Sequence, residues 1–561
     1  MEVSQVQQPS SSNGRRRPGG WITFPFLIAT TVGMNLAGGG WSSNLIVYLI
    51  KEFNVKSINA AQIANVVGGT LSLFPVLAAI IADSFLDCFS VVWISSVISL
   101  LGITLLAVTA SIPSLKPQPC VNGGGSDICK APTRAQFGVL YGGICLATMG
   151  QGGRAVIATM GANQFPDKPK NQTIFFNWFF FTMYVAMLIA STVVVYVEDN
   201  VSWECGFYIS AGANVVALAA FLVGTPFYRR PKPEGSPCTA LARVVVAAIR
   251  KRKLQLSSAE NNFYYGKHIL AKFTTPPSTS FEFLNRAAMR GNGDVAADGS
   301  NKKPWRLCNV REVEDFKTII RIIPLWSTAI FLSTPIAMNV SLSILQALTM
   351  DRHLGHHFQI PAGSIFVFSM LSTSLSLILF DRILSPAWRR LAGKPPTPLQ
   401  RVGTGHMFNI AAMVVSAVVE SKRQNAAAKS HALITPISVM WLLPQLALVG
   451  IGEAMHFPGQ LELYYQEFPA SLKNVSTSLA WVIIAIAFYL STALIDLLGR
   501  VTEWLPNNIN HGRLDNVYWL VTVIGVFNFA YFLICSWFYK YQNVKEVGHG
   551  ESNSLDIQSS L

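Results

Sequence analysis

The sequence predicts an all-α membrane protein with twelve transmembrane helices in two six-helix bundles. Of its 561 residues, 51% are hydrophobic and 13% are charged, and the mean hydropathy is +0.38. An ordinary soluble domain is about 25% charged. Twelve apolar runs approach or exceed the ~20 residues that a membrane-spanning helix needs. A basic segment divides them into two sets of six.

The first set comprises Phe24–Ile50, Ala61–Ala82, Val91–Ile112, Phe137–Met160, Thr173–Val197 and Cys205–Phe227, and the second comprises Thr318–Gln346, Pro361–Leu384, Val402–Glu420, Pro436–Pro458, Val475–Leu498 and Asn516–Tyr539. These runs divide the chain into an N-terminal tail (1–23), a first bundle (24–227), a linker (228–315), a second bundle (316–540) and a C-terminal tail (541–561). No cleavable signal peptide is expected, because the start is polar and the first apolar run is too long for one.

The distribution of charge predicts the orientation in the membrane. Arg229 through Lys317 contains seventeen Lys and Arg against eight Asp and Glu, so the positive-inside rule places the linker and both tails in the cytoplasm. Lys422, Arg423 and Lys429 contradict this rule, since they follow the ninth run on the opposite side. The net charge of +14 resides mostly in the tail and loops, which favours contact with lipid head groups over a nucleic-acid partner.

The same orientation puts the loop after the third run outside the cytoplasm. This loop holds Cys120 and Cys129 around a run of glycines. We expect these cysteines to form a disulfide, because the compartment permits one and the glycines let the loop close.

Two charged residues stand alone inside apolar runs. Arg154 and Glu453 each lie in a stretch without other charge, and a charge at the bilayer centre costs about 2.5–3.5 kcal/mol even on insertion scales. Such residues usually face a polar cavity and act there.

Six helices, a basic linker and six more helices is the layout of the major facilitator architecture, with a central site between the bundles. A channel is the alternative, but repeated pore segments are not evident. The sequence shows no sign of an enzyme, a cofactor or a metal cluster.

Several motifs resemble those of the plant nitrate and peptide transporter family, the plant arm of the proton-coupled oligopeptide transporters. They include Phe175-Phe-Asn-Trp178, Tyr196-Val-Glu-Asp-Asn200, Leu399-Gln-Arg-Val-Gly403, Trp441-Leu-Leu-Pro-Gln445 and Gly450-Ile-Gly-Glu453. The stretches Phe331–Ala337 and Asn510–Trp519 look more narrowly like the nitrate excretion transporter branch. The resemblance implies an alternating-access transporter of the major facilitator fold.

The chain departs from that family's pattern at the proton-coupling residues. Where proton-driven members carry a Glu-x-x-Glu-Arg/Lys signature in the first helix, this chain has Thr31, Met34 and Asn35, which do not titrate near neutral pH. The resemblance implies that these three residues line the substrate-binding cavity. The turn after the second helix retains only Asp83, which we expect to act in gating. The family's lysine in the fourth helix is Arg154 here.

The seventh helix also departs from the pattern. The family's nitrate-binding histidine aligns with Ile336, so Asn339 and Ser343 are the polar residues left on that helix to contact a substrate.

These changes leave a net positive cavity and predict an anion substrate. Arg154 suits nitrate or a carboxylate, because its planar donors bind bidentate anions and it keeps its proton. We hypothesise that Arg154 and Glu453 pair in one conformation and that the anion competes for Arg154. The predicted function is efflux of nitrate or a similar anion with weakened or absent proton coupling, at the plasma membrane or the tonoplast.

Two alternatives remain open. Ala37-Gly38-Gly39-Gly40 either packs helices tightly or widens the pocket, and a wide pocket would favour export of a larger metabolite such as a glucoside or hormone. A non-transporting sensor is the other alternative.

Overall fold

A computed structural model describes residues 19–118, 131–165, 169–230, 237–254, 263–266, 277–291, 293–296, 299–356, 358–394, 396–430, 434–468, 473–506 and 508–539. The first bundle contains α1 (Phe24–Ser43), α2 (Leu45–Lys51), α3 (Ser57–Ser84), α4 (Cys88–Ser111), α5 (Arg134–Gly150), α6 (Gly153–Ala162), α7 (Pro169–Ile189), α8 (Val195–Asn200) and α9 (Trp203–Val223). The linker contains α10 (Pro237–Arg250) and α11 (Glu282–Asn285). The second bundle contains α12 (Val310–Leu348), α13 (Val367–Leu379), α14 (Ser385–Ala392), α15 (Pro398–Ser430), α16 (Leu443–Glu467), α17 (Lys473–Val501) and α18 (Leu514–Phe538).

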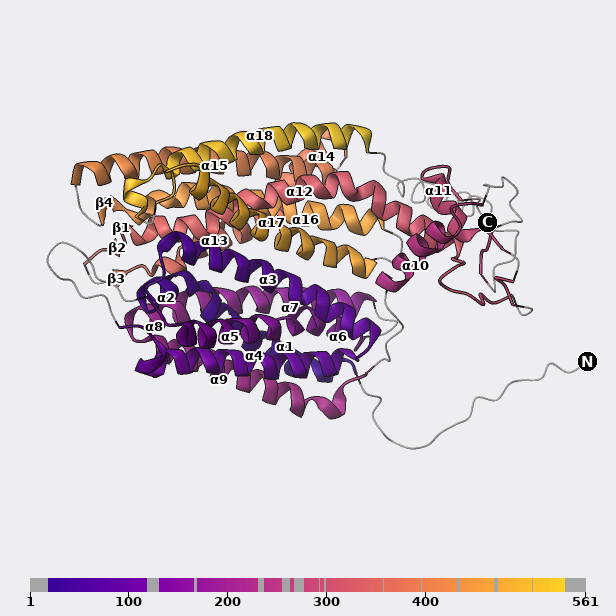
Figure 1. Ribbon diagram of the computed structural model, residues 1–561, viewed down its shortest axis with the longest axis horizontal. Helices are drawn as coiled ribbons and strands as arrows, with labels where there is room; N and C mark the ends of the chain where they lie inside the picture. The colour runs from indigo at the N-terminus through magenta and orange to yellow at the C-terminus, as the bar shows by residue number, and fades with distance from the viewer. Residues whose placement is uncertain are drawn as a thin grey trace, which may run out of the picture.

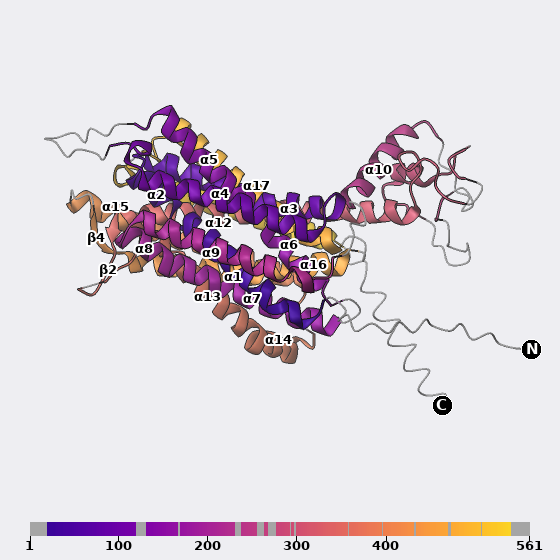
Figure 2. The same cartoon turned by 90° about the horizontal axis from the view of Figure 1, so that it is seen from below.

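The two sets of helices lie side by side as two bundles with nearly parallel long axes (Figure 1). The linker helices α10 and α11 lie beyond one end of the bundles, and Figure 2 shows α10 projecting from that same end. We call this the linker end. The opposite, far end carries two small two-stranded sheets, one pairing β1 (Met350–Asp351) with β4 (Thr435–Ser438) in parallel and one pairing β2 (His353–Leu354) with β3 (Phe358–Gln359) in antiparallel.

The described part of the chain contains 11 helical stretches that are long and apolar enough to cross a membrane. The fourth predicted run, Phe137–Met160, is the one that does not form a single spanning helix in the described part of the chain. It is broken into α5, of 17 residues, and α6, of 10 residues, with Gln151 and Gly152 in a turn between them. A Cβ on Gly152 would lie 3.0 Å from the Phe74 carbonyl, so the chain passes close to α3 at this turn. Two of the other runs continue through π-helical turns, Ala190–Val194 after α7 and Phe380–Leu384 after α13.

Helix α15 extends ten residues beyond the predicted end at Glu420, and this extension accounts for Arg423, one of the three charges that contradict the charge rule. Arg423 is fully buried, with its Nε 2.8 Å and its Nη2 2.7 Å from the two carboxylate oxygens of Glu420. Its Nη1 donates to Thr349 Oγ1 at 3.0 Å and to Asn510 Oδ1. Arg423 is therefore half of an internal ion pair and not a loop charge that would orient the chain.

Ionic and aromatic contacts join the bundles at the far end. Asp199, at the end of α8, pairs with Lys51 of its own bundle and, at 3.4 Å, with Arg352 from the loop after α12. The rings of Tyr196 and Phe358 stack across the same boundary with centroids 5.9 Å apart. The far end is thus closed by groups from both bundles.

Helices α3 and α17 hold the bundles together nearer the middle. Asn65 Nδ2 donates to Ser491 Oγ at 3.1 Å, and the hydroxyls of Thr70 and Tyr489 lie 3.0 Å apart. Among the described residues, no hydrogen bond or ion pair joins the two bundles in the half nearer the linker end. Within the described residues, the polar contacts between the bundles therefore lie at the far end and near the middle.

The linker has a small core of its own, built from α10, α11 and the start of α12. Inside it, Lys251 and Asp294 form a buried ion pair at 3.1 Å. Burial lowers the pKa of Lys251, and the Asp294 carboxylate opposes that shift. The linker is thus attached to the second bundle through the extended first turns of α12.

The buried pair in α15 leads to a stability prediction. Removing one partner of a buried ion pair leaves an uncompensated charge and costs about 3–5 kcal/mol. We expect Arg423→Ala to lower the thermal denaturation midpoint of the purified protein in detergent clearly, and Glu420→Gln to do the same. Lys429→Ala, an exposed residue on the same helix, is the control and should not shift it. A midpoint for Arg423→Ala equal to that of the control would contradict the prediction.

Candidate functional site

Arg154 lies in the first turn of α6, directly after the break in the fourth run. Its side chain remains partly exposed although it is deep within the first bundle. One guanidinium nitrogen, Nη1, donates to the Gln151 Oε1 at 3.2 Å. Among the described residues no carboxylate lies within ion-pair distance of Arg154. Within the described part of the chain, the side chain therefore has unused donors and no compensating charge.

Gln151 is held by a chain of buried polar groups that crosses the first bundle. Its Nε2 donates to Ser99 Oγ on α4 at 3.1 Å, and Asn214 Nδ2 on α9 donates to the same oxygen at 2.8 Å. A Cβ on Gly38 would lie 2.5 Å from Gln151 Oε1, so α1 presses against it as well. Gln151 thus presents a fixed acceptor to Arg154.

Glu453 lies on α16 in the other bundle and is also partly exposed. Its Oε2 accepts a hydrogen bond from Thr373 Oγ1 of α13 at 3.3 Å. The structure does not bring Glu453 and Arg154 into an ion pair. The hypothesised pair is therefore not a feature of this conformation.

The three first-helix positions face packed protein in this conformation. Thr31, Met34 and Asn35 are at most 2% exposed. The hydroxyl of Thr31 donates to the Leu27 carbonyl at 2.8 Å, and Asn35 Nδ2 donates to the Thr31 carbonyl at 2.7 Å. The Ser96 hydroxyl lies 3.5 Å from the Met34 sulfur. No titratable group replaces the family's carboxylates at these positions.

The polar residues predicted on the seventh helix belong to a buried network. Ser343 Oγ donates to Asn339 Oδ1 at 2.7 Å, and Asn339 Nδ2 donates to Ser416 Oγ at 3.1 Å. Gln445 Nε2 contacts both Ser343 Oγ and Gln346 Oε1 at 3.2 Å.

Gln346 in turn connects this network to the ion pair of α15. Its Nε2 donates to Glu420 Oε2 at 2.7 Å. Ile336 is 7% exposed, and Asn339 and Ser343 are 1% exposed. The predicted contact residues on this helix are thus tied to the interior of the second bundle.

The glycine run of α1 packs tightly. A Cβ on Gly39 would lie 2.8 Å from the Ala190 Cβ, and one on Gly40 would lie 2.3 Å from Ser210 Oγ. Of the two interpretations of this run, the structure therefore supports close helix packing and gives no evidence of a widened pocket.

Three predicted residues lie outside what the structure describes. Cys120 and Cys129 fall in the segment 119–130, and the side chain of Asp83 is not described. Within the described residues, no group of three or more His, Cys, Asp or Glu side chains is placed to hold a metal ion.

Sequence reasoning missed the supports of Arg154. Gln151 stands inside the Gly150-Gln-Gly-Gly-Arg154 motif, and Ser99 and Asn214 are isolated polar residues in apolar runs. Their isolation was a usable signal, because polar groups in the membrane need internal partners.

Comparisons with known proteins agree with this architecture. The family model described as PTR2, POT family, matches residues 89–511. Protein NRT1/PTR FAMILY 2.7 and Protein NRT1/PTR FAMILY 2.6 of Arabidopsis thaliana are each 52% identical over 551 residues, covering 97% of this chain and 97% of the relative.

Solved structures show the same fold at low identity. The crystal structure of an auto inhibited POT family peptide transporter has a TM-score of 0.67 at 16% identity and covers 93% of this chain and 98% of its own. The POT family transporter PepTSo has a TM-score of 0.68 at 16% identity, covering 92% and 98%. The chain is therefore a membrane transporter of the POT family, and it belongs to the NRT1/PTR group of that family.

Proposed function

We propose that this protein exports nitrate or a similar small anion from the cytoplasm without the first-helix proton coupling of its family. The observation that carries the proposal is Arg154, a partly exposed guanidinium deep in the first bundle with no carboxylate partner among the described residues. An unpaired charge at this depth is costly. A substrate anion would compensate it.

The chemistry of Arg154 favours a planar anion. A guanidinium has five N–H donors in a fixed fork, and Gln151 accepts from only one of its nitrogens. The remaining donors match two oxygens of nitrate or of a carboxylate. Gln151 orients the fork, because its own position is set by Ser99 and Gly38.

Thr31, Met34 and Asn35 support uncoupled transport because none of them can carry a proton near neutral pH. Efflux needs no proton, since a negative-inside potential drives an anion outward by about 2.3 kcal/mol per charge per 100 mV. The basic linker favours a cytoplasmic linker end. The contacts at the far end are consistent with a conformation closed to the outside and loaded from the cytoplasm. We propose the plasma membrane as its location, with the tonoplast as the alternative.

A liposome assay separates the alternatives. Purified protein is reconstituted, and nitrate, chloride and a neutral glucoside are followed under clamped voltage and pH. Nitrate flux that follows the voltage without acidifying the lumen supports the proposal. Movement of the glucoside alone would establish the larger-metabolite alternative, and ligand binding without any flux would establish a sensor.

Arg154 should carry the anion affinity. We expect Arg154→Gln to weaken nitrate binding by about 10–100-fold, because hydrogen bonds to a charged group contribute about 1.5–3 kcal/mol. Arg154→Lys should retain part of the affinity, since it keeps the charge and loses the fork. Titration of nitrate-dependent flux measures both. Arg134→Gln, an exposed arginine, is the control, and full transport by Arg154→Gln would refute the proposal.

Gln151 should act as a positioning residue. Gln151→Leu keeps the volume and removes the acceptor, so we expect the apparent affinity for nitrate to fall while the maximal flux falls less. Preference for nitrate over chloride should narrow as well, which a general loss of stability would not cause. Gln164→Leu changes another buried glutamine, bonded to the Met160 and Arg229 backbone, and should leave that preference intact.

Glu453 should matter for the return step and less for binding. Because it is not paired with Arg154 in this conformation, we expect Glu453→Gln to leave nitrate affinity from the linker end unchanged. Net efflux should fall more than nitrate–nitrate exchange, since exchange does not require the empty carrier to reorient. Equal losses of exchange and net efflux would assign Glu453 to substrate binding instead.

A further inference from the structure

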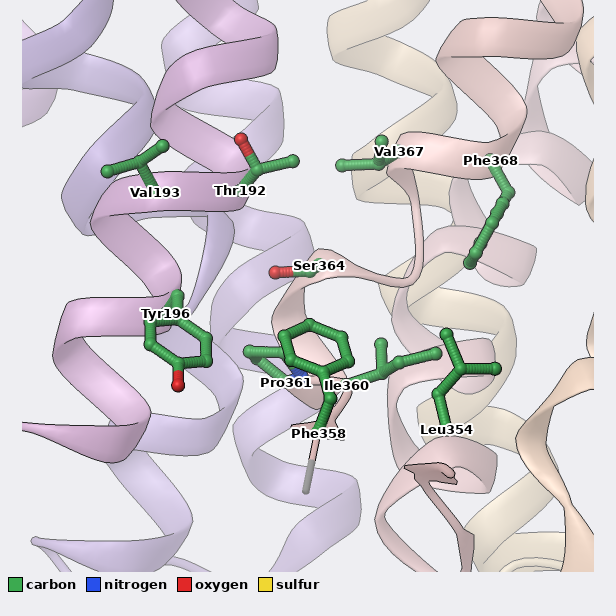
Figure 3. A pocket seen from close by; sticks show the side chains of 10 residues that line it. All are labelled: Thr192, Val193, Tyr196, Leu354, Phe358, Ile360, Pro361, Ser364, Val367 and Phe368. Atoms are coloured by element: carbon green, nitrogen blue, oxygen red, sulfur yellow. The ribbon is translucent and has the colours of Figure 1, made fainter. Parts of the chain in front are cut away.

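An apolar groove of about 430 Å³ lies between the two bundles near the far end, and this volume is in the range of small-molecule sites. It is lined by Thr192, Val193, Tyr196, Leu354, Phe358, Ile360, Pro361, Ser364, Val367 and Phe368 (Figure 3). None of the residues of the candidate anion site lines it. The groove is therefore distinct from the candidate anion site.

Both bundles contribute to the walls of the groove. Thr192, Val193 and Tyr196 come from the π-helical turn after α7 and from α8, and the other lining residues come from the second bundle. Since the walls belong to two bodies, the groove exists in this form only while the far end is closed.

The position of the groove indicates an occupant from the membrane. Thr192 lies eight residues before Asn200, the end of α8, which is about 12 Å along a helix and within a hydrocarbon layer about 30 Å thick. Val193, Leu354 and Phe358 on its walls are 56%, 51% and 43% exposed. Leu354 and Phe358 lie between the membrane-spanning stretches Val310–Leu348 and Ala362–Ala392. The groove therefore reaches the ends of the spanning helices, where an acyl chain joins its ester and head group.

One polar group in the wall lacks a partner. Ser364 is 8% exposed, and its hydroxyl has no hydrogen-bond partner in the described part of the chain. Figure 3 shows this hydroxyl directed toward the helix that carries Thr192 and Tyr196. A buried hydroxyl without an acceptor is destabilising by about 1–3 kcal/mol, so an occupant that supplies an acceptor oxygen would be favoured.

A basic side chain lies at the edge of the groove. Arg352 Nη1 donates to the carbonyl of Ile360, a lining residue, at 3.2 Å, and the Ile360 amide donates to the Arg352 carbonyl at 2.9 Å. The same nitrogen, Nη1, pairs with Asp199 at 3.4 Å, and the other guanidinium donors can bind a phosphate oxygen. The apolar wall of the groove matches the acyl tail of a phospholipid. The Ser364 hydroxyl matches its ester, and the Arg352 guanidinium matches its phosphate.

We propose that this groove binds an acyl chain of a membrane phospholipid, that Ser364 donates to its ester carbonyl, and that the bound lipid favours the conformation in which the far end is closed. A ligand shifts a conformational equilibrium by its difference in affinity for the two states. A site with walls on both bundles binds its ligand more tightly when the bundles are together than when they are apart. The lipid thereby acts as a ligand of one transport state.

Photolabelling tests the site directly. The full chain is placed in phosphatidylcholine nanodiscs that contain a phosphatidylcholine with a diazirine on its acyl chain, and labelled positions are mapped by mass spectrometry. We expect labels to concentrate on Tyr196, Leu354 and Phe358 and to fall several-fold in Val193→Trp, which fills the groove. Val216→Trp is the matched control, a 63% exposed valine on α9 outside the groove. It should leave groove labelling unchanged.

A second variant tests the dependence on conformation. Asp199→Asn removes the ion pair to Arg352 but leaves the guanidinium at the groove, so it should lower labelling of the groove only through opening of the far end. Labelling around Val216 should stay constant, which also reports that the protein is folded. Equal labelling of groove and α9 in every variant would overturn the proposal. Displacement of the label by a sterol, with none by unlabelled phosphatidylcholine, would also overturn it and assign the groove to a sterol.

Discussion

The structure depends on supplying partners inside the protein for charged and polar side chains whose helices are surrounded by lipid. Two arginines illustrate the two ways in which this is done. Arg423 is fully buried and neutralised by Glu420 within one helix. Arg154 has, among the described residues, the neutral Gln151 as its side-chain partner and keeps some exposure. The first arrangement stabilises a bundle, and the second leaves a charge available to a substrate.

The membrane-spanning runs were predictable because the bilayer imposes their length and polarity. Their interruptions were not, since they arise from contacts between helices. The turn at Gln151 and Gly152 depends on the close approach of α3, and the π-helical turns after Ile189 and Leu379 leave no compositional mark. The length of α15 was underestimated for a related reason. Lys422 and Arg423 were interpreted as the start of a loop, whereas Arg423 is compatible with a buried helix because Glu420 lies one turn before it.

Part of the candidate site could also be predicted. Arg154 and Glu453 stood out because isolated charges in apolar runs are rare, and both are partly exposed in the interior. The side chains that position Arg154 were not found, since Ser99 and Asn214 come from helices far apart in the sequence. For Asn339 and Ser343, the residues themselves were predictable and their partners were not. Their spacing identified one polar helix face, but only the fold reveals that Ser416 and Gln445 engage it.

Asp199 shows how a carrier can separate its two halves at moderate energetic cost. Lys51 and Arg352 bind this one carboxylate from opposite bundles. When the bundles move apart, Arg352 leaves with its own bundle and becomes accessible to water, while Lys51 stays with Asp199. In a conformation with the far end open, Asp199 would therefore keep Lys51 as a counter-ion. Of the two ion pairs at this carboxylate, opening would break the 3.4 Å pair to Arg352 and retain the pair to Lys51.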